Sequence, residues 1–282
     1  MRIFWFISIA GLVLFSACSK FQAIQKSPDP FKKYEAAMKY YDKKDYYRSG
    51  LLFEEIIPLI KGDPRSEEAQ FRYAYTQFHQ GMLELSAFHF NKFYETYARS
   101  PYATEARYMY AYSLYEDSPE YNLDQTNTYK AIDALQAFIN AYPDSEFAEK
   151  ATKLLMEERK KLEKKAYETA KLFNKIQDYH KAAVVVFNNF QRVYPESDYS
   201  EEIAFKKLEA EYKLAKKSTD SRKKERYQAA VEFYDAFLEK YPNSKFIRQA
   251  EDMYTASLKA LRDRNLNPGL EEKKKNSTQD NN

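Results

Sequence analysis

Residues 131–145, AIDALQAFINAYPDS, give the clearest indication of the fold of this chain. The apolar residues of this stretch are spaced four, three and four apart: Ala131, Leu135, Phe138 and Tyr142. Residues three and four apart lie on one face of an α-helix, so the stretch predicts an amphipathic helix. A small residue heads the buried face, and Pro143 ends the helix because proline lacks the N–H that the next turn would need.

The same spacing recurs along the chain. Residues 183–197, AVVVFNNFQRVYPES, and residues 230–244, AVEFYDAFLEKYPNS, repeat it with the proline in place. Two further copies lack that proline, and the earlier of them is weaker: Ser86, Phe90, Phe93 and Tyr97, and Ser49, Phe53, Ile56 and Ile60. The last residues of the five copies are 37, 45, 52 and 47 positions apart. Such a recurring face is typical of stacked helix pairs.

A serine follows each of the four stronger copies: Ser100, Ser145, Ser197 and Ser244. Serine is a preferred N-cap, so each one is predicted to cap the next helix. An aromatic residue lies two positions beyond each serine: Tyr102, Phe147, Tyr199 and Phe246. The repeat unit is therefore predicted as a helix, a short turn and a capped helix.

The spacing resembles the second helix of a tetratricopeptide repeat. The predicted fold is all-α: an α-solenoid of about five tetratricopeptide-like helix pairs plus a C-terminal capping helix at residues 244–261. The repeats are longer than the typical tetratricopeptide period of about 34 residues. We assign the extra residues to a polar loop at 117–127 and a charged loop at 216–226, KKSTDSRKKER. Residues 147–176 contain no Gly or Pro and form either one long helix or two. The alternative fold is an irregular helical bundle with coincidental phasing.

We expect the first residues of the sequence to be a targeting signal. Arg2 precedes an apolar run at residues 3–15, which as a helix would be about 20 Å long and too short to cross a membrane. This length is typical of a secretory signal. The run Phe15-Ser16-Ala17-Cys18 resembles the lipobox of bacterial lipoproteins, in which the signal peptidase cuts before an acylated cysteine. The alternatives are an ordinary signal peptide with an incidental cysteine, or a short buried helix.

These features divide the chain into five segments. We expect a lipoprotein signal peptide at 1–17 and a lipidated flexible tether at 18–30. N-terminal repeats one to three follow at 31–145, and C-terminal repeats four and five with the capping helix at 146–262. A disordered tail is expected at 263–282.

The composition argues against an enzyme. The five glycines are not clustered, as phosphate-binding loops and nucleophile elbows require. Three separated histidines and one cysteine exclude the common zinc motifs, so we expect no metal and no cofactor other than the covalent lipid on Cys18. A net charge of +3 gives no basis for nucleic-acid binding.

Five repeats behind a lipidated cysteine resemble the BamD family of outer-membrane assembly lipoproteins. The likeness is carried by residues 121–128, YNLDQTNT, with the helix and FINAYPDS that follow, and by residues 170–197 with the helix predicted after them. It covers about residues 31–261. This chain departs from the family in its charged insert and its very aromatic N-terminal repeats.

The resemblance implies a binding protein without an active site. It implies an outer-membrane-anchored lipoprotein that faces the periplasm and acts in the β-barrel assembly machinery as a scaffold and a receptor for unfolded outer-membrane proteins. Implied partners are those unfolded proteins on the N-terminal repeats, a BamA-like barrel protein with periplasmic domains on the C-terminal repeats, and other lipoproteins of the complex. The alternatives are a periplasmic tetratricopeptide adaptor of another envelope pathway, such as cell-wall synthesis, and an enzyme or solute-binding lipoprotein.

Aromatic residues form a stripe on two predicted first helices and are candidates for a peptide-binding groove: Phe31, Tyr34, Met38, Tyr41, Phe71, Tyr75 and Phe78. First helices line the groove of a tetratricopeptide stack, so these side chains are placed to hold an extended peptide with a terminal aromatic residue. The competing interpretation is that the stripe is core between helices, where such stripes are usually buried.

Overall fold

The computed structural model describes residues 20–176 and 179–266, which contain helices and no strand. The chain divides into two compact units, residues 1–160 and 161–282. Cys18 and the expected signal peptide lie outside the described residues, as does the expected tail from residue 267 onward.

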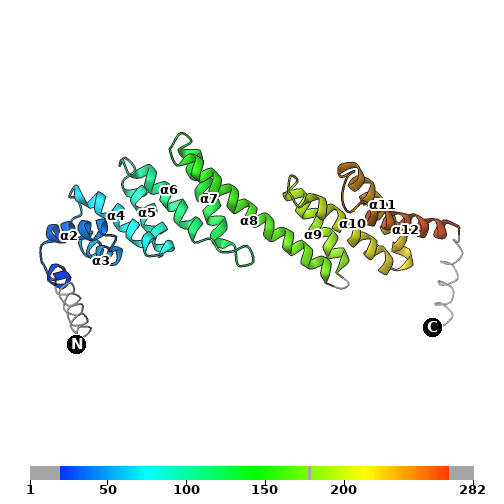
Figure 1. The fold of residues 1–282 in the computed structure, drawn as a ribbon, viewed down its shortest axis with the longest axis horizontal. Helices are drawn as coiled ribbons and strands as arrows, with labels where there is room; N and C mark the ends of the chain where they lie inside the picture. The colour runs from blue at the N-terminus through cyan, green and yellow to red at the C-terminus, as the bar shows by residue number, and fades with distance from the viewer. Residues whose placement is uncertain (1–19, 177–178, 267–282) are drawn as a thin grey trace, which may run out of the picture. The chain divides into compact units, whose positions relative to one another are not determined.

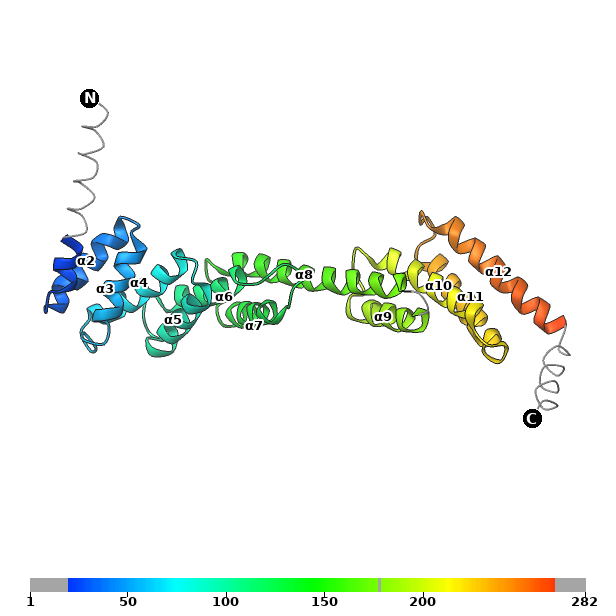
Figure 2. The ribbon, with the colours of Figure 1, turned by 90° about the horizontal axis from the view of Figure 1, so that it is seen from below.

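The N-terminal unit contains three helix pairs: α2 (Pro30–Asp42) with α3 (Tyr46–Ile56), α4 (Arg65–His79) with α5 (Leu83–Thr96), and α6 (Ala103–Glu116) with α7 (Thr126–Ala141). Each helix packs on the next one along the chain, as Figures 1 and 2 show. The boundary between the units falls within α8 (Ala148–Lys175). Residues 147–176 thus form one long helix rather than two.

The C-terminal unit contains the end of α8 followed by α9 (His180–Val193), α10 (Ser200–Lys217), α11 (Asp220–Lys240) and α12 (Ile247–Leu266). Helix α10 packs on α9, α11 and α12. The predicted capping helix is therefore present, and it extends five residues beyond its predicted end at residue 261.

The repeating face forms the core, as predicted. Each second helix buries its small residue and its first large residue at 6% exposure or less, in the pairs Ser49/Phe53, Ser86/Phe90, Ala131/Leu135, Ala183/Phe187 and Ala230/Tyr234. The small residue allows a neighbouring helix to approach closely, and the large one fills the space beside it. The all-α prediction of about five tetratricopeptide-like pairs and a capping helix is confirmed.

The serines do not act as N-caps, contrary to the prediction. The cap positions of α6 and α10 are Tyr102 and Tyr199, and neither makes a side-chain capping bond. A one-turn bend intervenes, because the backbone N–H of Ala103 donates to the carbonyl of Ser100. The serine hydroxyl accepts from the N–H two residues later, at 3.0 Å from Tyr102 and 3.0 Å from Tyr199.

Two segments expected to be irregular are helical. The prediction of a charged loop at 216–226 is wrong, because α10 continues to Lys217 and α11 begins at Asp220. Asp220 favours the start of α11 through the helix dipole and pairs with Lys223 at 3.3 Å.

The expectation of a flexible tether at 18–30 is corrected for the residues that the structure describes, because residues 20–25 are helical. The Phe21 ring meets Tyr40 edge-on at 5.6 Å, and Gln25 donates a hydrogen bond to Glu55 at 2.9 Å. This segment therefore packs on the first repeat.

Candidate functional site

The candidate residues lie on the first helices of the first two repeats, and their exposure differs. Tyr34 and Phe71 are buried, with exposures of 6% and 2%. The Phe71 ring stacks on Tyr102 with centroids 4.6 Å apart and meets Phe90 edge-on at 6.0 Å. These two positions belong to the core of their repeats.

The first helices follow a register of 37 residues, and this register extends the stripe onto a third helix. Three equivalent residues are buried: Tyr34, Phe71 and Tyr108. Two half-buried rows lie beside them: Met38, Tyr75 and Tyr112, and Tyr41, Phe78 and Tyr115. We call these six residues, five aromatic side chains and Met38, the aromatic rows. Tyr112 and Tyr115 were not predicted, because the repeats were phased only on their second helices; the period of 37 on the first helices would have revealed them.

Ring contacts connect the aromatic rows. Phe78 lies 5.5 Å from Tyr112, and Tyr112 stacks on Tyr115 at 6.1 Å between centroids. His79 stacks on Tyr75 at 5.9 Å and on Tyr46 at 4.1 Å. Burial, with a smaller effect of nearby Lys44, lowers the pKa of His79, so this ring is neutral at pH 7.

Glutamates on α4 and α6 accept hydrogen bonds from tyrosines of the preceding first helix. Tyr34 donates its hydroxyl to Glu68 at 3.0 Å, and Tyr75 donates to Glu105. Burial first, and then these carboxylates, raise the pKa of both tyrosines, which remain protonated donors. Arg72 lies 3.4 Å from Glu68, with its guanidinium 5.2 Å from the Tyr41 ring centroid.

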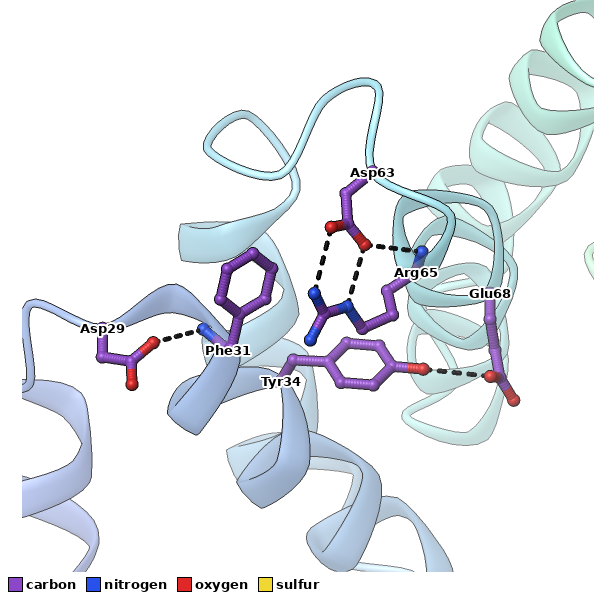
Figure 3. A network of polar contacts seen from close by, with 6 residues as sticks. All are labelled: Asp29, Phe31, Tyr34, Asp63, Arg65 and Glu68. Carbon is purple, nitrogen blue, oxygen red and sulfur yellow. Dashed lines mark hydrogen bonds and ion pairs between the residues drawn. The ribbon is translucent and has the colours of Figure 1, made fainter.

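Phe31 is 39% exposed and lies at the N-terminal end of the stripe (Figure 3). Its N–H donates to Asp29, which caps α2, at 2.9 Å. The guanidinium of Arg65 lies 3.7 Å from its ring centroid. Asp63 holds that guanidinium through two bonds of 2.8 and 3.0 Å and raises the pKa of Arg65. A cation–π contact of this geometry covers one side of the Phe31 ring.

The arrangement offers aromatic surface beside hydrogen-bonded polar groups. Rings of Tyr and Phe give a large contact area at low entropic cost, which suits binding of an extended peptide. Within residues 20–176 and 179–266, no group of three or more His, Cys, Asp or Glu side chains is placed to hold a metal ion. No helix in those ranges is long and apolar enough to span a membrane.

Comparison with known structures finds tetratricopeptide-like repeats. Two crystal structures of a putative kinesin light chain repeat protein from Podosopora anserina, one of them of a single-substitution variant, are each 13% identical to this chain with a TM-score of 0.32. The variant structure matches 75% of this chain and 95% of its own, and the other matches 77% and 100%. No curated protein sequence matches this chain significantly.

Two sequence families match the chain. The tetratricopeptide repeat family matches residues 209–244, which span the second half of α10 and all of α11. The family described as YfiO, outer membrane lipoprotein, matches residues 27–226, well over half of the chain. The resemblance noted in the sequence is thereby confirmed, and the chain belongs to the YfiO, or BamD, family of outer membrane lipoproteins.

Proposed function

We propose that this protein is a lipid-anchored, periplasm-facing subunit of the β-barrel assembly machinery of the outer membrane. In this role it is a scaffold and a receptor for unfolded outer-membrane proteins. The observation that carries the proposal is the family match over residues 27–226. The lipobox at residues 15–18 supports it, with Cys18 as the acylated residue and residues 1–17 as the signal peptide.

The N-terminal unit supplies the receptor surface. The aromatic rows cross α2, α4 and α6, and together with Phe31 they present ring surface without a net charge of their own. An unfolded barrel strand alternates apolar and polar residues, so its apolar side chains match the rings. The buried residues Tyr34 and Phe71 support this surface from below and do not contact the peptide.

The C-terminal unit provides the scaffold function. We assign to it the docking of a BamA-like barrel protein through that protein's periplasmic domains, with other lipoproteins of the complex as further partners. Tetratricopeptide-like repeats suit this role because stacked helix pairs give extended surfaces for protein binding.

Affinity purification in mild detergent tests the assignment to the complex. The tagged full-length protein is isolated from its membranes, and copurifying proteins are quantified by mass spectrometry. We expect a large outer-membrane barrel protein with repeated periplasmic domains in near-equal amount. Recovery of cell-wall enzymes without such a barrel protein would contradict the proposal and support an adaptor of another envelope pathway.

Site-specific photo-crosslinking tests the receptor surface. A photoreactive phenylalanine analogue is placed at Tyr112 or Tyr115, and at the matched controls Tyr47 and Tyr129, which are 65% and 57% exposed and lie on second helices. We expect cross-links to newly synthesised barrel proteins from the aromatic rows and not from the controls. Equal cross-linking from all four positions would show that the rows are not a specific receptor surface.

A further inference from the structure

The turn between α10 and α11 has an unusual concentration of positive charge. Residues 213–226, here called the basic tip, contain seven Lys or Arg and two Asp or Glu, a net charge of +5. The whole chain has a net charge of +3, so its other residues sum to −2. The tip lies where two packed helices of the C-terminal unit meet their connecting turn (Figure 1).

The basic tip is ordered by its own short-range contacts. Arg222 pairs with Glu225 at 3.1 Å, and Lys223 pairs with Asp220 at 3.3 Å. Arg226 donates to the hydroxyl of Ser218, which in turn donates to the carbonyl of Leu214. These bonds hold the turn as a closed end of the helix pair. The net charge of +5 remains after these pairs, because it already includes Asp220 and Glu225.

Between residues 216 and 225, every exposed side chain of the basic tip is polar or charged. The exposed cations are Lys216, Lys217, Arg222 and Lys224, and the other exposed residues are Thr219, Ser221 and Glu225. The centres of protein interfaces are enriched in aromatic residues and depleted of lysine, so the tip has the wrong composition for one. Exposed lysines without an apolar anchor instead suit a diffuse anionic surface.

A second basic sequence in the chain lacks this excess. Residues 157–168 of α8 contain five Lys or Arg but also four Glu, for a net charge of +1. Its exposed lysines, Lys160 and Lys164, have the same chemistry as those of the tip. A comparison of the two segments therefore distinguishes binding that needs a concentrated net charge from binding that any exposed lysine would give.

We propose that the basic tip contacts the anionic phospholipid headgroups of a bilayer surface. The interaction is electrostatic: several ammonium groups approach a negatively charged lipid layer together, and the attraction is lost within about a Debye length, roughly 10 Å at 0.1 M salt. Such a contact, added to an acyl anchor, supplies the second membrane signal that stable attachment uses. The proposal rests on the charge and exposure of the tip and does not require the receptor function.

Lysine footprinting tests this proposal on the full-length protein isolated from its membrane. The protein is incorporated into vesicles of phosphatidylcholine alone or of phosphatidylcholine mixed with phosphatidylglycerol. Lysines are then acetylated, and each site is quantified by mass spectrometry. We expect several-fold less labelling of Lys216, Lys217 and Lys224 on the anionic vesicles at low salt, full labelling at high salt, and no change at Lys160 and Lys164.

Two triple variants that remove equal charge complete the test. In the wild-type protein the anionic vesicles should also protect Lys213, which belongs to the tip. This protection should disappear in Lys216→Gln/Lys217→Gln/Lys224→Gln and persist in Lys153→Gln/Lys160→Gln/Lys164→Gln. Equal labelling of the tip on both kinds of vesicle at low salt would overturn the proposal. Protection of the tip in detergent by a copurifying acidic protein, without anionic lipid, would also overturn it and identify a protein partner instead.

Discussion

Single hydroxyl groups join the turns of this protein to its helices. The serines at 100, 197 and 244 each accept an N–H bond within their own turn and donate to a glutamate on the first helix of the same repeat, at Glu67, Glu163 and Glu201. In the third repeat the equivalent residue is Thr104, and Ser145 keeps only the turn bond among those described, from Phe147 at 3.1 Å. In the first repeat Asp63 replaces the serine and accepts from the N–H of Arg65 at 2.9 Å.

Removing the serine should therefore cost more where the glutamate is present. We expect Ser100→Ala to lower the free energy of unfolding of the N-terminal unit by about 1–3 kcal/mol, because it leaves the Tyr102 N–H and Glu67 without that partner. Ser145→Ala is the matched control and should cost less than Ser100→Ala. Urea unfolding of both variants measures the difference, and equal losses would show that the Ser100–Glu67 bond contributes nothing.

The ion pairs of Glu209 should make the stability of the C-terminal unit sensitive to acid. Burial opposes its ionisation, but hydrogen bonds from Lys213 at 2.8 Å and Lys206 at 2.9 Å outweigh that effect and lower its pKa to about 2. A carboxylate with a depressed folded pKa stabilises the fold above its unfolded pKa, and this stability is lost as pH falls towards the folded value. We expect the free energy of unfolding to decrease between about pH 5 and pH 2, more steeply in wild type than in Glu209→Gln. Identical pH profiles of the two proteins would exclude this contribution.

At the scale of elements, stacked aromatic pairs join each first helix to the turn that follows its partner. Four such pairs recur with centroids 3.9–4.7 Å apart: Phe71/Tyr102, Tyr108/Phe147, Tyr167/Tyr199 and Phe205/Phe246. In the first repeat Arg65 takes the place of the turn aromatic and lies over Phe31 instead. The repeating unit is thus a helix pair, a hydroxyl-bonded turn and a ring stack.

Loss of one stack should loosen the next helix. Phe246 stacks on Phe205 at 4.5 Å and lies just before α12. We expect Phe246→Ala to destabilise the C-terminal unit by about 2–3 kcal/mol, less than the cost of truncating a fully buried ring. Hydrogen exchange should show α12 losing protection first. Leu238→Ala, at a position 37% exposed, is the control, and an equal effect of the two changes would refute a special role for the stack.

The whole molecule contains separate cores on either side of residue 160. Phe138 is fully buried in a cluster formed by α4 to α8, and Phe187 is fully buried in a cluster formed by α8 to α10. In repeat proteins each unit depends mainly on its neighbours, so stability is a sum of local contributions. Each unit is accordingly expected to respond to changes in its own core.

We therefore predict that the two units unfold in distinguishable steps. Phe138→Ala should cost about 3–5 kcal/mol and raise hydrogen exchange in α4 to α7, while α10 and α11 keep their protection. Phe187→Ala should produce the opposite pattern. A simultaneous loss of protection throughout the chain in either variant would show that both cores unfold as one cooperative unit.

The helical-repeat fold and the family could be predicted from the amino-acid sequence, because both depend on local patterns. The spacing of Ala131, Leu135, Phe138 and Tyr142 places these residues on one face whatever surrounds the helix, and the resemblance of residues 15–18 to a lipobox is visible in the sequence alone. The charges of residues 216–226 predict a solvated loop, but opposite charges three residues apart also stabilise helix ends, as Arg222 with Glu225 and Lys223 with Asp220 do here.

The accessibility of each aromatic residue, in contrast, depends on tertiary packing and could not be predicted. Tyr34 and Tyr41 have the same chemistry and lie on the same helix, yet Tyr34 is buried against Phe53 while Tyr41 is half-buried. The difference arises from how closely α3 and α4 approach α2, and that distance depends on side chains far away in sequence. A helical period identifies the apolar face of a helix, but the exposure of each ring on that face is determined by the neighbouring helices that pack against it.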